Sequence, residues 1–142
     1  NRLLELGVLP IINENDTVST EEMGIGDNDT LAAIVAVSTK AELLILLSDI
    51  DGLYTSDPRH NPDAKLISVV RELSEVMKYA GEPGSSLGTG GMKTKLHAAE
   101  LCTAAGCDMV ISNGAKPMLL YDIADGKDAG TRFLAPLKRQ KN

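Results

Sequence analysis

Three apolar runs constrain the fold of this chain more than any other feature. "VLPII" at residues 8–12, "LLILLS" at 43–48 and "DMVIS" at 108–112 lack the alternation of polar and apolar residues that a strand with one face in water shows. Continuous runs of this length are typical of strands covered on both faces, as in a parallel sheet between two layers of helices. A fourth run, "KLISVV" at 65–70, also predicts a strand.

Helical patterns alternate with these runs. They cover residues 28–40, 73–80, 92–105 and 117–124. "GTRFL", near the end of the chain, predicts a short edge strand. Because strands and helices alternate along the chain, we expect an α/β fold in the form of a three-layer α/β/α sandwich with a mainly parallel sheet.

Composition narrows the class of protein. The chain has 142 residues, 43% of them hydrophobic, which suits one globular domain. The net charge of −6 argues against a nucleic-acid partner, because such domains concentrate lysine and arginine. The sequence predicts no membrane span and no signal peptide, and its two cysteines, Cys102 and Cys107, suggest no disulfide framework. A reducing cytoplasm is the expected location.

The two ends suggest a piece of a longer protein. The chain begins without methionine, in what reads as the last turns of a helix at residues 2–6. Residues 136–142 form a basic tail or the start of a linker. We therefore expect further sequence upstream.

Polar residues follow three of the predicted strands, where the carboxyl ends of parallel strands gather ligands. Residues 13–16, "NEND", follow the first strand, and residues 27–29, "DND", open the next helix. Each of these residues alone suits a turn or a helix cap. Together, amides beside carboxylates suit a substrate that carries both ammonium and carboxylate groups, which describes an amino acid.

Ser48 and Asp49 end the second strand, and the Asp51–Gly52 turn follows them. Such residues bind Mg²⁺, a ribose or a phosphate, or simply terminate a buried strand. Asp57, in the expected turn "DPR", is a weaker candidate for a ligand contact.

A glycine-rich loop, "GSSLGTGG", leads into the helix that carries Lys93 and Lys95. A helix N-terminus is already positive, so lysines in the first turn suit a bound polyanion that the loop amides can approach closely. The stretch matches neither common phosphate-binding glycine motif, and a loop with two solvated lysines is the alternative.

The same helix carries His97 and Cys102, with Cys107 just beyond it. Spacings of five residues do not place these side chains on one helix face and match no usual zinc pattern, so core or surface roles are expected. Met92, Leu96, Ala99 and Thr103 form the expected buried stripe.

In order, "INENDTV", "GDND", "LLSDIDGLYTSDPR" and "GTGGMKTKLHAAELC" resemble the amino acid kinase family over nearly the whole chain. The resemblance implies the carbamate kinase-like fold, of which this chain supplies the C-terminal, nucleotide-binding portion and part of the acceptor site within residues 1–135. "INEND", "GDND" and "GTGGMxTK" are similar to members that transfer the γ-phosphoryl group of ATP to the side-chain carboxylate of glutamate, the first step of proline biosynthesis.

The resemblance also implies roles for individual residues. Asp16 and Asn28 match positions that hold glutamate, and Asn13 lines the same pocket. Ser48 and Asp49 match a nucleotide-contacting pair. The loop that wraps the ATP phosphates matches Thr89, Gly90, Gly91, Met92, Lys93, Thr94 and Lys95. Lys95 also matches a catalytic lysine that stabilises the transferring phosphoryl group, and Asp29 matches an aspartate that orients the catalytic lysines.

This chemistry agrees with the residues. A carboxylate acceptor is already ionised at neutral pH, since the pKa of an unperturbed glutamate side chain is about 4.3, so the enzyme needs no general base. It needs alignment, positive charge and Mg²⁺ around the phosphoryl group. The resemblance implies ATP and Mg²⁺ as cofactors, glutamate as acceptor, proline as a feedback inhibitor and a homo-oligomer. It leaves the residues that hold the metal open.

Family members begin with a strand and a glycine-rich turn that carries another phosphate-binding lysine, and nothing here corresponds to them. We therefore expect the isolated chain to have little or no activity. The alternatives are another kinase of this fold, the kinase half of a bifunctional pyrroline-carboxylate synthase, or a non-catalytic module that senses an amino acid.

Overall fold

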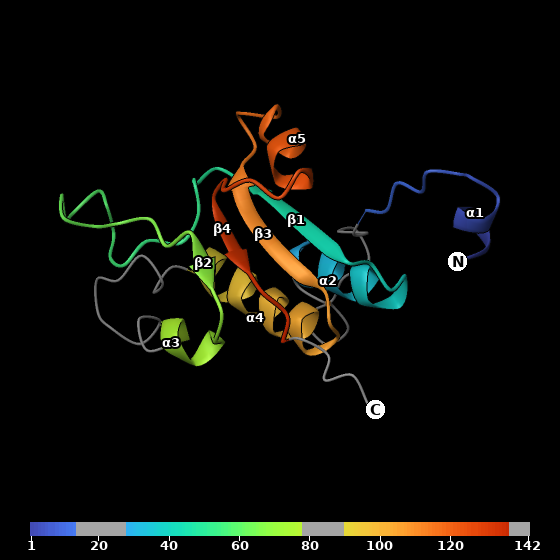
Figure 1. Ribbon diagram of the computed structural model, residues 1–142, viewed down its shortest axis with the longest axis horizontal. Coiled ribbons are helices and arrows are strands. Elements are labelled where there is room, and N and C mark those ends of the chain that lie inside the picture. The colour runs from blue at the N-terminus through green and yellow to red at the C-terminus, as the bar shows by residue number, and fades with distance from the viewer. Residues whose placement is uncertain (14–27, 78–89, 137–142) are drawn as a thin grey trace.

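The computed structural model describes residues 1–13, 28–77 and 90–136 (Figure 1). Helices and strands alternate through most of these ranges, as the sequence predicts. In chain order they are α1 (Arg2–Glu5), α2 (Asn28–Ser38), β1 (Leu43–Ser48), β2 (Val69–Val70), α3 (Leu73–Met77), α4 (Gly90–Ala104), β3 (Asp108–Asn113), α5 (Leu119–Ala124) and β4 (Thr131–Phe133).

The four strands form one sheet in the order β1-β3-β4-β2. β1 runs parallel to β3 along its whole length, so that Leu43 lies opposite Asp108 and Ser48 opposite Asn113. β2 and β4 are also parallel, whereas β3 and β4 are antiparallel. The predicted mainly parallel sheet is therefore confirmed for the described part of the chain.

Helices cover both faces of this sheet. α2 and α4 lie against one face and α5 lies on the opposite side (Figure 1). The expected stripe on α4 is buried, with Met92, Leu96, Ala99 and Thr103 each at most 8% exposed. On the other face Ile123 of α5 is 1% exposed, and its carbonyl oxygen accepts a hydrogen bond from Arg132 of β4. These contacts confirm the three-layer α/β/α architecture.

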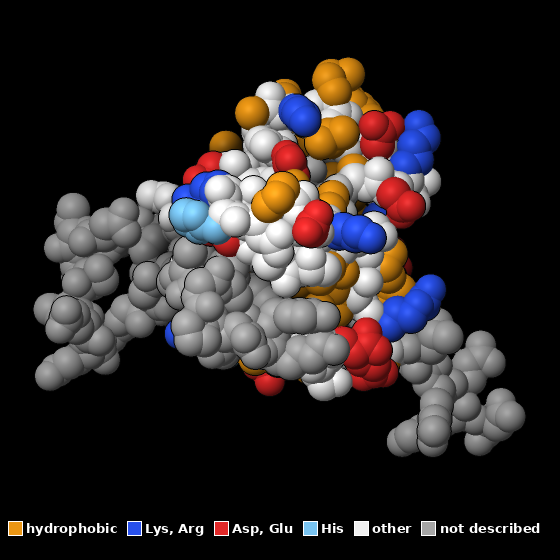
Figure 2. Space-filling view, turned by 90° about the vertical axis from the view of Figure 1, so that its left-hand side faces the viewer, with side chains coloured by type: hydrophobic (Ala, Val, Ile, Leu, Met, Phe, Trp, Pro, Cys, Tyr) orange, Lys and Arg blue, Asp and Glu red, His pale blue; other side chains and the backbone are white. Residues whose placement is uncertain are grey.

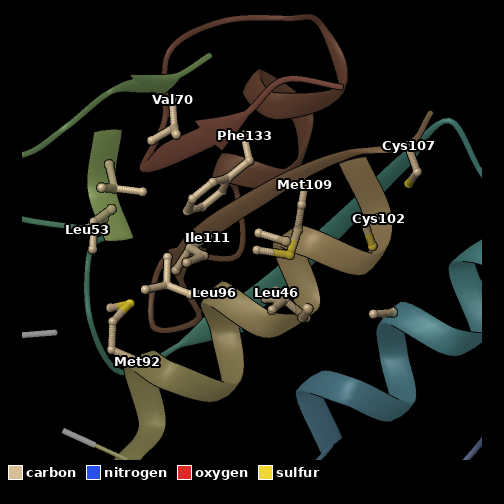
Figure 3. Packing of buried hydrophobic residues seen from close by; sticks show 14 of the residues in the cluster. Leu46, Leu53, Val70, Met92, Leu96, Cys102, Cys107, Met109, Ile111 and Phe133 are labelled. Carbon is tan, nitrogen blue, oxygen red and sulfur yellow. The ribbon is translucent and has the colours of Figure 1, made fainter. Parts of the chain in front are cut away.

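The main core lies between the sheet and α4 (Figure 3). Met109, Ile111 and Phe133 point from the sheet towards Leu96 and are each completely buried. Full burial of a side chain of this size stabilises a fold by about 1.5–3 kcal/mol. The alternate residues of β3, Val110 and Ser112, are buried on the opposite face, which explains why "DMVIS" shows no alternation.

The prediction of a strand at residues 8–12 is wrong. These residues have no regular structure, and Leu9 and Ile11 are 84% and 93% exposed. A strand needs a neighbour to accept and donate its backbone hydrogen bonds, and none of the four described strands pairs with this segment. Apolar content alone therefore does not make it a strand.

The last predicted strand forms, but it is not at an edge. β4 lies between β3 and β2, and the backbone N–H groups of Arg132 and Leu134 donate to the carbonyl oxygens of Ser68 and Val70. The strand predicted at 65–70 shortens to Val69–Val70, because Leu66 instead forms an isolated bridge with Tyr54.

The predicted helices are confirmed with shifted ends. α2 ends two residues before the predicted 28–40 span does, and α4 begins two residues before the predicted 92–105 span. α3 covers the first part of the predicted span 73–80, and residues 78–80 lie outside the described ranges.

Candidate functional site

A cavity of about 600 Å³ opens at the carboxyl ends of β1 and β3. Ser48 ends β1 and Asn113 ends β3, and the parallel register places these two residues opposite each other at its wall. The remaining wall comes from the loop after β1 and from the first turns of α4. The lining residues are Ser48, Asp49, Ile50, Asp51, Gly52, Tyr54, Asp57, Pro58, Arg59, Gly91, Met92, Lys95 and Asn113.

An ion pair joins α4 to α2 beside this cavity. Lys95 Nζ lies 3.0 Å from Asp29 Oδ2, with the two side chains 14% and 22% exposed. The hydroxyl of Thr94 lies 2.8 Å from the same carboxylate oxygen. A lysine ammonium group has three donors, so one can remain on Asp29 while the others bind an anion in the cavity that Lys95 lines.

This pair changes the interpretation of the lysines at the start of α4. Since α4 begins at Gly90, Lys95 is in its second turn rather than its first. Asp29, in the first turn of α2, compensates the Lys95 charge and is itself well placed on a positive helix end. A bound polyanion is therefore not needed to hold Lys95 in place.

Ser48 and Asp49 lie in the cavity wall. The Ser48 hydroxyl donates to Asp49 Oδ1 over 3.2 Å. A hydroxyl and a carboxylate at the end of a strand can bind a ribose hydroxyl, a metal ion or a phosphate through a metal ion.

Asp57, considered above as a weaker candidate for a ligand contact, lines the cavity and also holds its own turn together. Its carboxylate accepts hydrogen bonds from Arg59 Nε at 3.1 Å, from Arg59 Nη2 at 2.9 Å and from the Arg59 backbone N–H at 2.9 Å. These bonds hold the pKa of Asp57 below its usual range. The Arg59 side chain is 74% exposed at the cavity mouth.

Asp51, in the turn considered above for a metal ion, a ribose or a phosphate, lines the cavity. So do Asn113 and Tyr54, which are not among the site residues predicted from the sequence. Asn113 Nδ2 donates to Asp51 Oδ1 over 2.9 Å, and the Tyr54 hydroxyl donates to Asp51 Oδ2 over 3.3 Å. The bond from Asn113 lowers the pKa of Asp51, whereas burial and the neighbouring carboxylate raise the pKa of Tyr54. Asn113 could have been found from its position directly after a buried strand.

The other predicted residues divide into four groups. Gly91 and Met92 line the cavity. Gly90, Lys93 and Thr94 belong to α4 beside the cavity, and Lys93 is exposed. Asn13 and Asn28 do not line the cavity. Asp16 and Thr89 lie outside the described residues, as do Glu14, Asn15, Asp27 and most of the glycine-rich loop.

The residues considered for zinc have core and surface positions. Cys102 and Cys107 are free and buried, and burial raises the pKa of Cys102 to about 12. The side chain of His97 is 55% exposed. In the part of the chain that the structure describes, no group of three or more His, Cys, Asp or Glu residues is arranged to hold a metal ion.

Acidic and basic side chains are interspersed on the face shown in Figure 2. Apolar side chains gather at its upper end, at the level of α5, where Met118 and Tyr121 are 71% and 69% exposed. Within the described ranges, every helix falls short of the length and hydrophobicity needed to cross a membrane.

A family profile and individual relatives agree on the family to which this chain is similar. The sequence profile of the amino acid kinase family matches residues 1–113. A glutamate 5-kinase of Herpetosiphon aurantiacus is 56% identical over 131 residues, which are 92% of this chain and 35% of that protein. A glutamate 5-kinase of Clostridium perfringens is 51% identical over 138 residues, which are 94% of this chain and 51% of that protein. The chain thus spans about a third to a half of these relatives.

Three solved structures with a similar fold each align with 78% of this chain. Isopentenyl phosphate kinase of T. acidophilum in a product complex has a TM-score of 0.57 and 25% identity over 40% of its own length. UMP kinase of Ureaplasma parvum has a TM-score of 0.59 and 22% identity over 43% of its length. N-acetylglutamate synthase of Neisseria gonorrhoeae, complexed with coenzyme A and L-arginine, has a TM-score of 0.59 and 25% identity over 24% of its length.

Proposed function

The chain belongs to the amino acid kinase family, and from this we propose that it is the nucleotide-binding part of a glutamate 5-kinase. Such an enzyme is a phosphotransferase that moves the γ-phosphoryl group of ATP to the side-chain carboxylate of L-glutamate. The names of relatives at 51–56% identity support the choice of acceptor. The observation that carries the proposal is the Lys95–Asp29 pair beside a cavity at the carboxyl edge of the sheet.

Lys95 is the catalytic residue of this part. Its ammonium group stabilises the negative charge that spreads over the phosphoryl oxygens during transfer. Asp29 is a positioning residue, because it holds Lys95 Nζ at 3.0 Å and so fixes the charge before substrate arrives. Thr94, 2.8 Å from the same Asp29 oxygen, limits the freedom of that carboxylate. No residue is needed to remove a proton, since the glutamate side chain is already ionised.

Mg²⁺ fits the carboxylates of the cavity. Mg²⁺ is usually held by one or two carboxylates together with phosphate oxygens and water, so a group of three protein ligands is not required. Asp49 lines the cavity beside Ser48 and would hold the ion. When bound, Mg²⁺ neutralises charge on the ATP phosphates and orients them.

The glutamate site is proposed at Asn13, Asp16 and Asn28. Asn28 directly precedes Asp29, which supports a place for the acceptor next to the lysine that stabilises the transferring group. The remaining nucleotide contacts are proposed at Thr89, Gly90, Gly91, Met92, Lys93 and Thr94. The loop amides would contact the phosphates, as the glycines permit.

The wider biology follows from the same proposal. The enzyme would act in proline biosynthesis in the cytoplasm, where the free thiols of Cys102 and Cys107 would stay reduced. Feedback inhibition by proline and a homo-oligomeric state belong to the proposal. So does the division into a partial kinase domain at 1–135 and a tail or linker at 136–142. We expect the isolated chain to have little activity, as it spans a third to a half of its relatives.

An acceptor panel tests the proposed function. The full-length protein that contains these residues is incubated with Mg²⁺ and ATP together with glutamate, aspartate, N-acetylglutamate, UMP or isopentenyl phosphate, and ADP release is measured. We expect release with glutamate at least a hundredfold above that with the other compounds. If ADP release with another acceptor equals or exceeds that with glutamate, glutamate is not the preferred substrate. No ADP release with any of the five compounds would overturn the kinase function.

The similarity to N-acetylglutamate synthase complexed with coenzyme A and L-arginine favours a second candidate, a module that binds an amino acid without phosphorylating it. The two candidates differ in what Lys95 does. A binding module would bind an amino acid but would not hydrolyse or transfer phosphate from ATP. In such a module, Lys95→Ala would leave the affinity for the amino acid unchanged.

A further inference from the structure

The loop that follows β1 is attached to the neighbouring strands at three points. At its start, the Gly114 N–H donates to the Ser48 carbonyl oxygen over 2.8 Å. At its end, the Leu53 N–H donates to Thr131 Oγ1 over 2.8 Å, and this hydroxyl in turn donates to the Ile67 carbonyl oxygen over 2.6 Å. Between them, Asn113 Nδ2 donates to Asp51 Oδ1 over 2.9 Å.

The orientation of the Asn113 amide is fixed from both sides. Its Oδ1 accepts a hydrogen bond from the Ala115 N–H over 2.9 Å, which directs Nδ2 towards Asp51. The Asp51 carboxylate also accepts from the Tyr54 hydroxyl. A side chain at Gly130 would overlap the Ile111 carbonyl oxygen and approach the Asp51 carbonyl oxygen to 3.0 Å, so the backbone of the loop packs closely on the sheet.

Of the three attachments, only the Asn113–Asp51 bond is made by two side chains of the cavity wall. Asp49 lies two residues before Asp51 in the same loop and also lines the cavity. Because the two residues are so close in one loop, a shift of Asp51 is expected to shift Asp49 in the cavity wall as well.

We propose that Asn113 is a positioning residue for the nucleotide: through Asp51 it sets the place of the loop that carries Asp49. This inference rests on the proposed function in requiring that the cavity bind ATP, and it is independent of the acceptor. It predicts that the pair affects the KM for ATP more strongly than kcat, while the KM for the acceptor stays nearly constant.

The test uses Asn113→Asp, Asp51→Asn and the exchanged pair of both substitutions in the full-length protein. Asn113→Asp opposes two carboxylates, whereas the exchanged pair restores a donor, an acceptor and a single negative charge. At neutral pH Asn113→Asp loses this exposed hydrogen bond, which predicts a KM for ATP raised about two- to tenfold. Asp51→Asn keeps an amide oxygen that can accept from Asn113 Nδ2, so a smaller rise in the KM for ATP is expected. The exchanged pair is expected to return it to within about twofold of the wild type.

Asn61→Ala is the matched control. Asn61 Nδ2 donates to Ser56 Oγ over 2.9 Å in an equally exposed bond, and Asn61 does not line the cavity. We expect its KM for ATP to be unchanged. A wild-type KM for ATP in Asn113→Asp, or an exchanged pair as impaired as Asn113→Asp, would overturn the inference. If glutamate is not the acceptor, the same comparison of KM for ATP is made with the acceptor that is turned over, and if the wild type uses no ATP the inference falls too.

Discussion

Two ion pairs at the cavity differ in what they connect. Lys95 and Asp29 are 66 residues apart in sequence, join α4 to α2 and are 14% and 22% exposed. Arg59 and Asp57 are two residues apart, shape one turn, and include an arginine that is 74% exposed. The first pair fixes a positive charge between two helices, whereas the second fixes a loop to itself. In the proposed enzyme we therefore expect the pair between the helices, and not the local pair, to contribute to phosphoryl transfer.

The largest expected effect is on Lys95. In the full-length protein, Lys95→Ala should lower kcat about a hundredfold to a thousandfold, because it removes one preorganised donor at developing charge. Steady-state assays of ADP release with saturating ATP and glutamate measure it.

Lys93→Ala is the control for this prediction. Lys93 carries the same charge on the same helix but is exposed. We expect its effect on kcat to be at least tenfold smaller. Equal effects of the two substitutions would mean that only the overall positive charge of α4 matters.

A smaller effect is expected from Asp29→Asn, which keeps the shape of the side chain and removes its charge. Lys95 and Thr94 lose the carboxylate that holds them, so kcat should fall about tenfold to a hundredfold through misplacement of Nζ. Kinetics at fixed pH, with circular dichroism to verify folding, measure the effect. An unchanged kcat would show that Lys95 is positioned by other groups.

The smallest expected effect belongs to the local pair. Because Arg59 lowers the pKa of Asp57 in the folded state, the pair contributes stability above the unfolded pKa of Asp57, near 3.8, and loses it as the pH falls through the lower folded value. Asp57→Asn should therefore lower Tm slightly at neutral pH, and this difference from the wild type should shrink at acidic pH. Kinetic constants for ATP should change less than with Asp29→Asn.

Arg59→Ala is the complementary variant to Asp57→Asn, because it removes the arginine of this ion pair and leaves the Asp57 carboxylate in place. The Asp57 side chain is 9% exposed, so Arg59→Ala leaves a nearly buried carboxylate without its main hydrogen-bond donor. Thermal unfolding should therefore show a larger loss at neutral pH for Arg59→Ala than for Asp57→Asn. A fall in kcat as large as that of Asp29→Asn would remove the distinction between the two pairs.

The sequence predicts the parts of the molecule that periodicity controls. β1, β3, α2 and α4 follow from apolar runs and a buried stripe, and Lys95 and Asp29 follow from their motifs. The segment at 8–12 does not form a strand, because a strand needs a second strand to pair with. An apolar run in the sequence does not show whether such a partner is present. β4 has only three residues, too few for a pattern that distinguishes the middle of a sheet from its edge.

Asn113 shows what local sequence omits from the site. Its role depends on the register that places it opposite Ser48 and on a hydrogen bond to Asp51, 62 residues away. Nothing within a few residues of Asn113 indicates either contact. Lys95 and Asp29 are equally distant in sequence, but each stands in a motif that the family resemblance identifies.

The most direct test of the account is calorimetric titration of the 142-residue chain with Mg²⁺ and a non-hydrolysable ATP analogue, with Lys95→Ala and Lys127→Ala in parallel. Lys127 pairs with Asp122 and does not line the cavity, so it is the control. The account predicts binding by the wild type that Lys95→Ala weakens at least tenfold and Lys127→Ala leaves unchanged. Equal binding by the wild type and Lys95→Ala, or no binding by a wild-type chain shown to be folded, would contradict the claim that Lys95 and this cavity form the phosphate site.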